Sequence, residues 1–406
     1  MYKYKTIVFL VETPFTKRDE ERFGIAEIRS NGLEVVVYQL SQIFHKEEYK
    51  DREIDNNDQK LVYDFSNLAD LRKALTSGKT EKIVILLMTQ YLVLLKLLNQ
   101  ISVDYSLHFT NQIPSVSVKS DLSVADKIKV FLSENGFIGA VFKVPLFALN
   151  FIKNRIKKGI LNPKYVIAGG KYSILSLSEK IRKSAKIVWA HSLDYDQYLR
   201  GKEIGPTPDF YDIYGKKYPV ESISDAIVFL DEYSPYHPDN AFFGIAYADK
   251  PETYYPTLEK FFAHLETIFQ KKVVVAAHPR SEYTDKDHFK EFIVIRGRTN
   301  DLIQSSSFAL LHSSTSINFV NLYQKPAIFF YTSTMTDRYK QMTNLFAEWH
   351  NANSVEIGLE SDLSQFDFYK LINKPLDYTK YKDSFIKTLD SENDYSWNIF
   401  LNEFRV

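Results

Sequence analysis

Short apolar runs of four to six residues recur along the whole chain and alternate with amphipathic segments. Such runs occupy residues 6–11, 34–38, 83–88, 165–168, 186–190, 226–230, 272–277, 292–295, 308–311 and 327–331. They are rich in Val, Ile and Leu and are apolar at successive positions, as expected for strands covered on both faces in a parallel sheet. Helical periodicity lies between them, for example at 255–270. The alternation predicts α/β units with right-handed crossovers.

The length and the interruptions of this pattern predict two domains. At roughly 100–200 residues per domain, 406 residues suggest two. The pattern is broken around 200–225, where the chain is rich in Gly, Pro and polar residues. We therefore expect an N-terminal Rossmann-like domain at 1–205, a linker at 206–225 and a C-terminal Rossmann-like domain at 226–406, which face a central cleft. The amphipathic final segment, 378–406, is expected to be a helix that could cross back to the N-terminal domain.

Composition excludes several classes of protein. The chain has 51 Lys and Arg against 51 Asp and Glu, so a general attraction to nucleic acid is not expected. It has no cysteine, which excludes disulfides, thiol nucleophiles and thiolate metal sites. No apolar run approaches the ~18–20 residues that cross a bilayer. We therefore expect a cytoplasmic protein, which could associate peripherally with a membrane assembly complex at the inner face.

Ligands of doubly wound sheets bind beyond the carboxyl ends of the strands, so the residues that follow each run are the first candidates for a site. The run 272–277 leads into His278-Pro279-Arg280, and the run 308–311 leads into His312-Ser313-Ser314-Thr315 before a predicted helix. Imidazole, guanidinium, hydroxyl and free backbone N–H groups suit a phosphate. The alternatives are an ordinary surface turn and a simple helix cap.

Carboxylates follow three other runs. Asp231 and Glu232 directly follow 226–230 and are candidates for a nucleophile and a general base, although a solvated acidic turn would look the same. Glu12 follows the first run. Asp194-Tyr195-Asp196 has the D-x-D form that binds a divalent ion in some nucleotide-sugar enzymes, but no further ligand pattern accompanies it, so no metal site is predicted.

Motifs of other enzyme classes are absent from the sequence. There is no G-x-G-x-x-G dinucleotide fingerprint, P-loop, G-x-S-x-G elbow or H-E-x-x-H. With these classes set aside, two Rossmann-like domains with a His278-Pro279 turn and a downstream Ser313-Ser314 turn resemble the GT-B glycosyltransferases that use CMP-activated acidic sugars. These include bacterial sialyltransferases and the Kdo transferases of capsule, O-antigen and lipopolysaccharide assembly. The segment VFLDEYSPYHPD at 228–239 is most similar to the retaining β-Kdo transferases.

The resemblance implies transfer of Kdo or a related ulosonic acid from a CMP-sugar to a glycan or lipid-linked glycan acceptor, without a metal or other cofactor. The N-terminal domain would bind the acceptor and the C-terminal domain would bind the CMP-sugar. In the C-terminal domain, the CMP phosphate would be held by His278, Pro279, Arg280, Ser313, Ser314 and Thr315. Asp231 would be the nucleophile of a retaining reaction. Glu12, Asp194 and Glu232 are candidates for the acceptor base, and Lys17, Arg18 and Arg280 could pair with the sugar carboxylate.

Three other functions stay open. Asp231-Glu232 is followed by Tyr233 and not by the Gly of the sialyltransferase motif, which ranks an inverting, sialyltransferase-like enzyme second. A CDP-polyol phosphotransferase would release CMP and could use the same His and Ser contacts. A non-catalytic protein that binds CMP or sugar would need the same surface without the chemistry.

Overall fold

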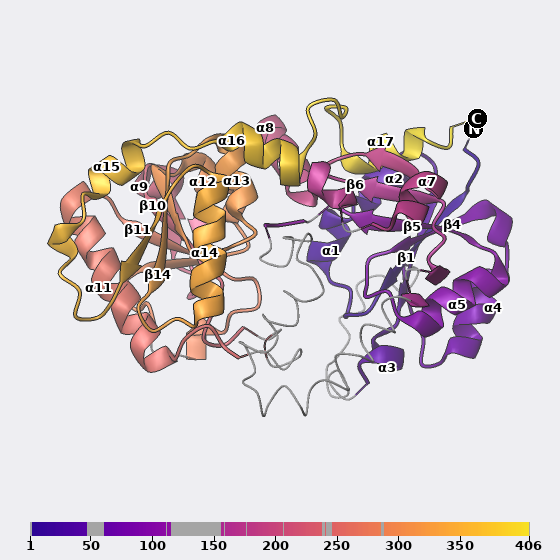
Figure 1. Cartoon of the computed structure of the whole chain (residues 1–406), viewed down its shortest axis with the longest axis horizontal. Coiled ribbons are helices and arrows are strands. Elements are labelled where there is room, and N and C mark those ends of the chain that lie inside the picture. The colour runs from indigo at the N-terminus through magenta and orange to yellow at the C-terminus, as the bar shows by residue number, and fades with distance from the viewer. Residues whose placement is uncertain are drawn as a thin grey trace. The chain divides into compact units, whose positions relative to one another are not determined.

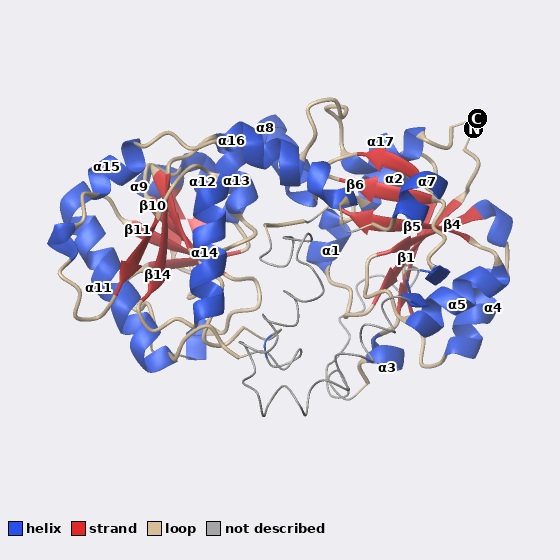
Figure 2. Cartoon of the chain, viewed as in Figure 1, coloured by secondary structure: helices blue, strands red, loops and turns tan. Residues whose placement is uncertain are grey.

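The computed structural model describes residues 2–46, 61–110, 112–114, 156–157, 159–175, 177–205, 207–237, 240, 246–285 and 288–405. They form two compact units. Unit 1 contains the described residues of 2–112, 156–193 and 387–405, and unit 2 contains those of 194–386 together with 113 and 114. Figures 1 and 2 show that each unit is a twisted sheet with helices on its faces.

Unit 1 is built on one parallel sheet of the order β3-β2-β1-β4-β5-β6-β7. Its strands are β1 (Thr6–Val11), β2 (Glu34–Gln39), β3 (Val62–Asp64), β4 (Lys82–Leu86), β5 (Asp104–Phe109), β6 (Tyr165–Ala168) and β7 (Lys186–Trp189). Its helices are α1 (Lys17–Arg22), α2 (Ile25–Ser30), α3 (Ser41–Phe44), α4 (Leu68–Thr76), α5 (Leu92–Ile101), α7 (Glu179–Ser184) and α17 (Ser396–Asn402).

The sheet of unit 1 is buried on both faces, as its apolar strands require. Ile7, Phe9 and Val11 of β1 point into one core, which includes residues of α2 and α17. Val8 and Leu10 point into a second core, which includes the apolar faces of α4 and α5. Because strand side chains alternate between faces, one uninterrupted apolar run supplies both cores.

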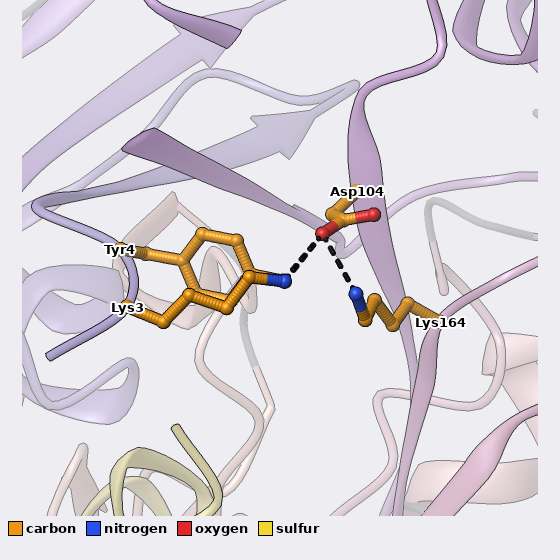
Figure 3. A network of polar contacts seen from close by, with 4 residues as sticks. All are labelled: Lys3, Tyr4, Asp104 and Lys164. Atoms are coloured by element: carbon orange, nitrogen blue, oxygen red, sulfur yellow. Dashed lines mark hydrogen bonds and ion pairs between the residues drawn. The ribbon is translucent and has the colours of Figure 1, made fainter. Parts of the chain in front are cut away.

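A polar cluster at the amino edge of this sheet joins the chain start to β5 (Figure 3). Asp104, the first residue of β5, accepts hydrogen bonds from Tyr4 Oη at 2.5 Å and from the ammonium groups of Lys3 and Lys164 at 3.1 Å each. Tyr2 also forms a bridge with Arg405, which places both chain ends on unit 1 (Figure 1). The cluster lies at the opposite edge from the strand ends where ligands are expected.

Unit 2 contains a second parallel sheet, of the order β12-β11-β10-β13-β14-β15. Its strands are β10 (Ile227–Leu230), β11 (Val273–Ala277), β12 (Ile293–Arg296), β13 (Phe308–Leu311), β14 (Ala327–Thr332) and β15 (Ser354–Ile357). Its helices are α8 (Leu193–Ile204), α9 (Val220–Ile223), α11 (Pro251–Phe269), α12 (Thr299–Ser305), α13 (Ile317–Tyr323), α14 (Asp337–Trp349), α15 (Phe368–Asn373) and α16 (Tyr378–Tyr381). In Figure 1, α11 and α14 flank the strands on opposite sides.

The predicted fold class, α/β with two Rossmann-like domains, is confirmed. All ten predicted strands occur in these two sheets, and every pairing within them is parallel. The division between the units falls after residue 193, upstream of the predicted linker at 206–225. Within that segment lie the antiparallel hairpin β8 (Asp209–Tyr211) and β9 (Lys217–Pro219) and the helix α9 of unit 2. Residues 387–405 return to unit 1.

Within the described part of the chain, no helix combines the length and the hydropathy needed to cross a membrane.

Candidate functional site

Three adjacent strands of unit 2 bring the predicted residues together. The central strand β10 pairs with β11 on one side and with β13 on the other. Asp231 and Glu232 follow β10, His278 follows β11, and Ser313 lies just after β13. The strand order reverses between β10 and β13, which is where doubly wound sheets bind ligands. The sheet topology therefore turns residues that are up to 82 positions apart in sequence into neighbours.

Asp231 is a buried carboxylate held by three donors. It is 5% exposed. Its Oδ1 accepts a hydrogen bond from the backbone N–H of Tyr233 at 2.8 Å, and its Oδ2 accepts from the backbone N–H of His278 at 3.1 Å and from the Tyr283 hydroxyl at 3.0 Å. Tyr233 itself has a positive φ of 53°. Burial raises the pKa of Asp231 to about 6, against the lowering effect of these donors.

Glu232 turns toward the other neighbouring strand. Its Oε1 accepts a hydrogen bond from the backbone N–H of Ser313 at 2.6 Å, and its Oε2 accepts from the Ser313 hydroxyl at 3.3 Å. Burial raises the pKa of Glu232 to about 7, and the nearby Asp231 charge adds to the shift. Two neighbouring carboxyls with pKa values near neutrality are typical of sites that move protons.

His278 lies at the end of β11, where Pro279 ends the strand. Its Nδ1 accepts a hydrogen bond from the backbone N–H of Arg280 at 3.2 Å. A neutral imidazole with Nδ1 as acceptor carries its proton on Nε2, so this ring can donate a hydrogen bond to a ligand. The ring of His237 lies 4.8 Å from that of His278, measured between centroids. Pro279 and Arg280 are exposed.

The turn after β13 precedes α13 and is longer than predicted. The predicted helix begins at 314, whereas α13 begins at Ile317 with Ser316 as its N-cap. Ser314 is buried and its hydroxyl accepts from the Ser316 N–H at 3.4 Å, while Thr315 is exposed. Both Ser313 donors are bound to Glu232. A phosphate that used the Ser313 donors would replace that carboxylate.

Two buried side chains to which the sequence assigned no individual role lie beside the site. Tyr283 lies in a short 3₁₀ turn, has no exposed surface and donates its hydroxyl hydrogen bond to Asp231. His312 is buried between the Phe330 carbonyl, 2.6 Å from its Nδ1, and the Tyr254 hydroxyl, 3.0 Å from its Nε2. Burial lowers the pKa of His312 to about 4, so the ring is neutral at pH 7. Neither role has a local sequence signal, because the partners are 52 or 58 residues apart.

Glu12 lies in unit 1, at the end of β1, in a different polar cluster. Its Oε1 accepts from the backbone N–H and hydroxyl of Thr89 at 2.8 and 2.9 Å, and its Oε2 lies 2.9 Å from the Tyr91 hydroxyl and 3.1 Å from His45 Nε2. Burial alone would raise the pKa of Glu12, but these hydrogen bonds outweigh it and lower the pKa. This arrangement holds the loop after β4 in place.

Asp194 and Asp196 lie in the first turn of α8. Asp194 accepts a hydrogen bond from the Asn318 side chain at 2.8 Å, and Asp196 is buried. Among the residues that the structure describes, no group of three or more His, Asp or Glu side chains is placed to hold a metal ion. Lys17 is exposed, and the side chain of Arg18 lies outside the described part.

Comparison with protein-family models gave no match, and comparison with curated protein sequences gave none. Solved structures do match over nearly the whole chain. The UDP-GlcNAc 2-epimerase of Methanocaldococcus jannaschii is 11% identical, with a TM-score of 0.46 and coverage of 93% of this chain and 96% of that one. The UDP-GlcNAc 2-epimerase of Neisseria meningitidis bound to UDP-GlcNAc is 12% identical, with a TM-score of 0.46 and coverage of 98% of each chain.

Acinetobacter baumannii MurG is 8% identical, with a TM-score of 0.44 and coverage of 98% of this chain and 99% of that one. Two of these three proteins are named for a UDP-sugar, whereas the sequence predicts a CMP-sugar donor. At such identities and TM-scores, the likeness does not extend to matching individual residues.

Proposed function

We propose that the protein is a glycosyltransferase that moves an ulosonic acid such as Kdo from a CMP-sugar to a glycan acceptor. The observation that carries the proposal is the convergence of Asp231, Glu232, His278 and Ser313 at the strand-order reversal of unit 2. This edge combines neutral hydrogen-bond donors suited to a phosphate with two carboxyls suited to chemistry at an anomeric carbon.

Each residue has a role that follows from its contacts. His278, with its proton on Nε2, would donate to the departing CMP phosphate. The N–H and hydroxyl of Ser313 would stabilise the developing phosphate charge once Glu232 releases them. Asp231, fixed by three donors, would attack the anomeric carbon and form a glycosyl ester, with CMP as the leaving group. The acceptor hydroxyl would then displace Asp231, which gives net retention.

Among the three candidates for the acceptor base, the contacts favour Glu232. Its carboxyl lies in the same cluster as Asp231, and its pKa of about 7 is near the optimum for a general base at neutral pH. Glu12 is bound by three side chains in unit 1, and Asp194 is bound by Asn318 on α13. Within the described part of unit 2, Asp194 does not contact the Asp231 cluster.

The burial of Asp231 also fits a second reaction route, in which Asp231 is not the nucleophile. A carboxylate that is 5% exposed and already accepts three hydrogen bonds is also suited to orienting its neighbours. In that case Glu232 would deprotonate the acceptor directly, and the product would be inverted, as in a sialyltransferase-like enzyme.

One experiment tests the function and separates the two routes. We expect calorimetry to show CMP binding by the wild type and by Asp231→Asn, which keeps the shape of the side chain and removes its charge. We expect Asp231→Asn to lose nearly all transfer from a CMP-ulosonic acid. Intact-mass analysis of the wild type with donor alone should show a sugar-sized adduct on the peptide that contains Asp231. An inverted product without an adduct would assign the reaction to Glu232, and absence of CMP binding would contradict the proposed function.

A further inference from the structure

Unit 1 contains a cavity that the proposed reaction does not use. It has a volume of about 290 Å³ and is lined in part by Arg22 and Phe23 at the end of α1, Met88 and Gln90 after β4, and His108 on β5. This volume is near the lower end of the ~300–1,000 Å³ of small-molecule sites, so it suits one ring-sized compound. The cavity lies at the carboxyl ends of β4 and β5, beside the end of α1, and carboxyl ends of strands are the usual ligand position in such a sheet.

Hydrogen bonds and close packing support two walls of this cavity. Glu12 holds the loop after β4 through Thr89 and Tyr91, and that loop carries Met88 and Gln90. Gly24 has a positive φ of 58° and lies in the turn after α1, close to Trp397. A Cβ at this position would lie 2.3 Å from Trp397 Cδ1, so only glycine allows the turn to come this close. The position of this turn sets the positions of Arg22 and Phe23 in the cavity wall.

Arg22 gives the cavity its charge. Its Nε is shielded from solvent, and within the described part of the chain it has no hydrogen-bond partner. His108 adds no charge at neutral pH, because burial and the nearby Arg22 lower the pKa of this imidazole to about 3. No lining residue is acidic. A half-buried guanidinium whose Nε has no partner is a contact that an anionic ligand can satisfy.

The other lining groups suit a hydroxylated ring. Gln90 and Gln112 line the cavity, and neither has a side-chain hydrogen bond to another described residue. Their amides can both donate to and accept from hydroxyl groups. The Phe23 ring is held by Phe9 and Phe15, each with a centroid 5.8 Å away, and offers a flat apolar surface.

We propose that this cavity binds an oxyanion on a sugar-sized polyol, either a sugar carboxylate or a sugar phosphate, with Arg22 as the charged contact. A guanidinium matches both oxyanions through two parallel hydrogen bonds. The proposal does not depend on the chemistry at Asp231. A failure of CMP binding in unit 2 and a failure of anion binding in unit 1 are therefore separate results.

Calorimetry on the full chain tests the proposal with glucuronate, glucose 6-phosphate and glucose as probes. We expect one or both anions to bind with a dissociation constant in the millimolar range, and neutral glucose to bind about tenfold more weakly or not at all. Preference for glucuronate would identify a carboxylate site, and preference for glucose 6-phosphate would identify a phosphate site. Equal binding of all three probes, or binding of neither anion, would overturn the proposal.

Two variants and one control test whether Arg22 is the residue that binds the anion. Arg22→Gln should weaken binding of the preferred anion about tenfold or more, while Arg72→Gln, an exposed arginine of α4, should bind as the wild type does. Gln90→Glu keeps the side-chain shape and adds a negative charge, so it should weaken anion binding and leave glucose unaffected. If Arg22→Gln fails to fold, Gln90→Glu alone decides. Unchanged anion binding in Gln90→Glu and Arg22→Gln would contradict the assignment.

Discussion

At the scale of single residues, the imidazole of His278 has the most direct predicted effect on turnover. Because Nδ1 accepts the Arg280 N–H, the neutral ring carries its proton on Nε2, from which it would be donated to the leaving phosphate under the proposed mechanism. We expect His278→Ala to lower kcat by about 100-fold or more, the usual range for loss of a general acid. His264→Ala, on α11 of the same unit, is the control and should keep full activity. Wild-type turnover in His278→Ala would contradict the assigned role.

The raised pKa of Glu232 predicts a pH-dependent effect on stability. The folded chain keeps this proton up to a pKa of about 7, whereas the unfolded chain releases it near 4.5. The wild type should therefore lose stability as the pH rises from about 4.5 to 7, and Glu232→Gln should remove the part of that loss that comes from Glu232, leaving the part that comes from the raised pKa of Asp231. We expect Glu232→Gln to be more stable than the wild type at pH 8, by at most about 3 kcal/mol, and the gain to shrink toward pH 5.

Urea unfolding of the wild type and Glu232→Gln at pH 5 and pH 8 measures this difference. Glu291→Gln, which removes an exposed carboxylate of the same unit, should show no comparable change between the two pH values. A gain in Glu232→Gln that is the same at both pH values would show that its carboxyl is not the group that titrates.

The candidate site shows what a sequence can predict at this scale. Asp231, His278 and Ser313 each follow an apolar run, so the rule that ligands bind at strand ends selects them before the fold is known. That Ser313 binds Glu232, and that Tyr283 binds Asp231, could not be predicted in the same way. These contacts depend on which strands are neighbours in the sheet and on the direction of the side chains in a turn. The local pattern of apolar residues predicts neither.

At the scale of elements, the turn between α1 and α2 predicts a measurable cost of adding one methyl group. Gly24→Ala would meet Trp397 and would also force a positive φ of 58° on a non-glycine residue. We expect it to lower the free energy of unfolding by about 2–4 kcal/mol. Gly32→Ala is the matched control, because Gly32 also has a positive φ, 80°, but no atom within 4 Å of its Cβ position.

The difference between the two variants in urea unfolding isolates the contact with Trp397. We expect Gly32→Ala to cost about 1 kcal/mol, from the backbone alone. Equal losses in Gly24→Ala and Gly32→Ala would mean that the turn can move away from Trp397 without cost, and would weaken the argument that the Arg22 cavity is preformed.

Element prediction succeeded where the apolar run was uninterrupted and failed where polar residues broke it or the strand was short. Each of the ten apolar runs is a strand of one of the two sheets. The strand β5, with the sequence DYSLHF, was missed because Asp104 and His108 interrupt the apolar run, although Tyr105, Ser106 and Leu107 are buried. The edge strand β3, with the sequence VYD, is only partly covered and needs no apolar run. The hairpin β8–β9 lies in a segment whose Gly and Pro content is equally typical of a linker.

At the scale of the whole molecule, residues 387–405 belong to the first unit and contribute buried aromatic rings to its core. Trp397, Phe400 and Phe404 of this segment are buried in unit 1, where Phe400 contacts Tyr165 of β6 with ring centroids 5.7 Å apart. The sequence predicts that such a segment could cross back, because its apolar residues recur with helical periodicity. It cannot say which sheet face they cover, since that choice depends on which cores the rest of the chain leaves incomplete.

This arrangement predicts that a change near the C-terminus weakens the first unit selectively. Phe400→Ala removes a fully buried ring and should cost about 3–5 kcal/mol. In hydrogen exchange followed by mass spectrometry, we expect peptides from β1 and β6 to lose protection while peptides from β10 and β11 keep it. Leu389→Ala, at a side chain that is 71% exposed in the same segment, should change neither. Equal loss of protection in both units would mean that they unfold together, and that the C-terminal segment stabilises the whole chain and not the first unit alone.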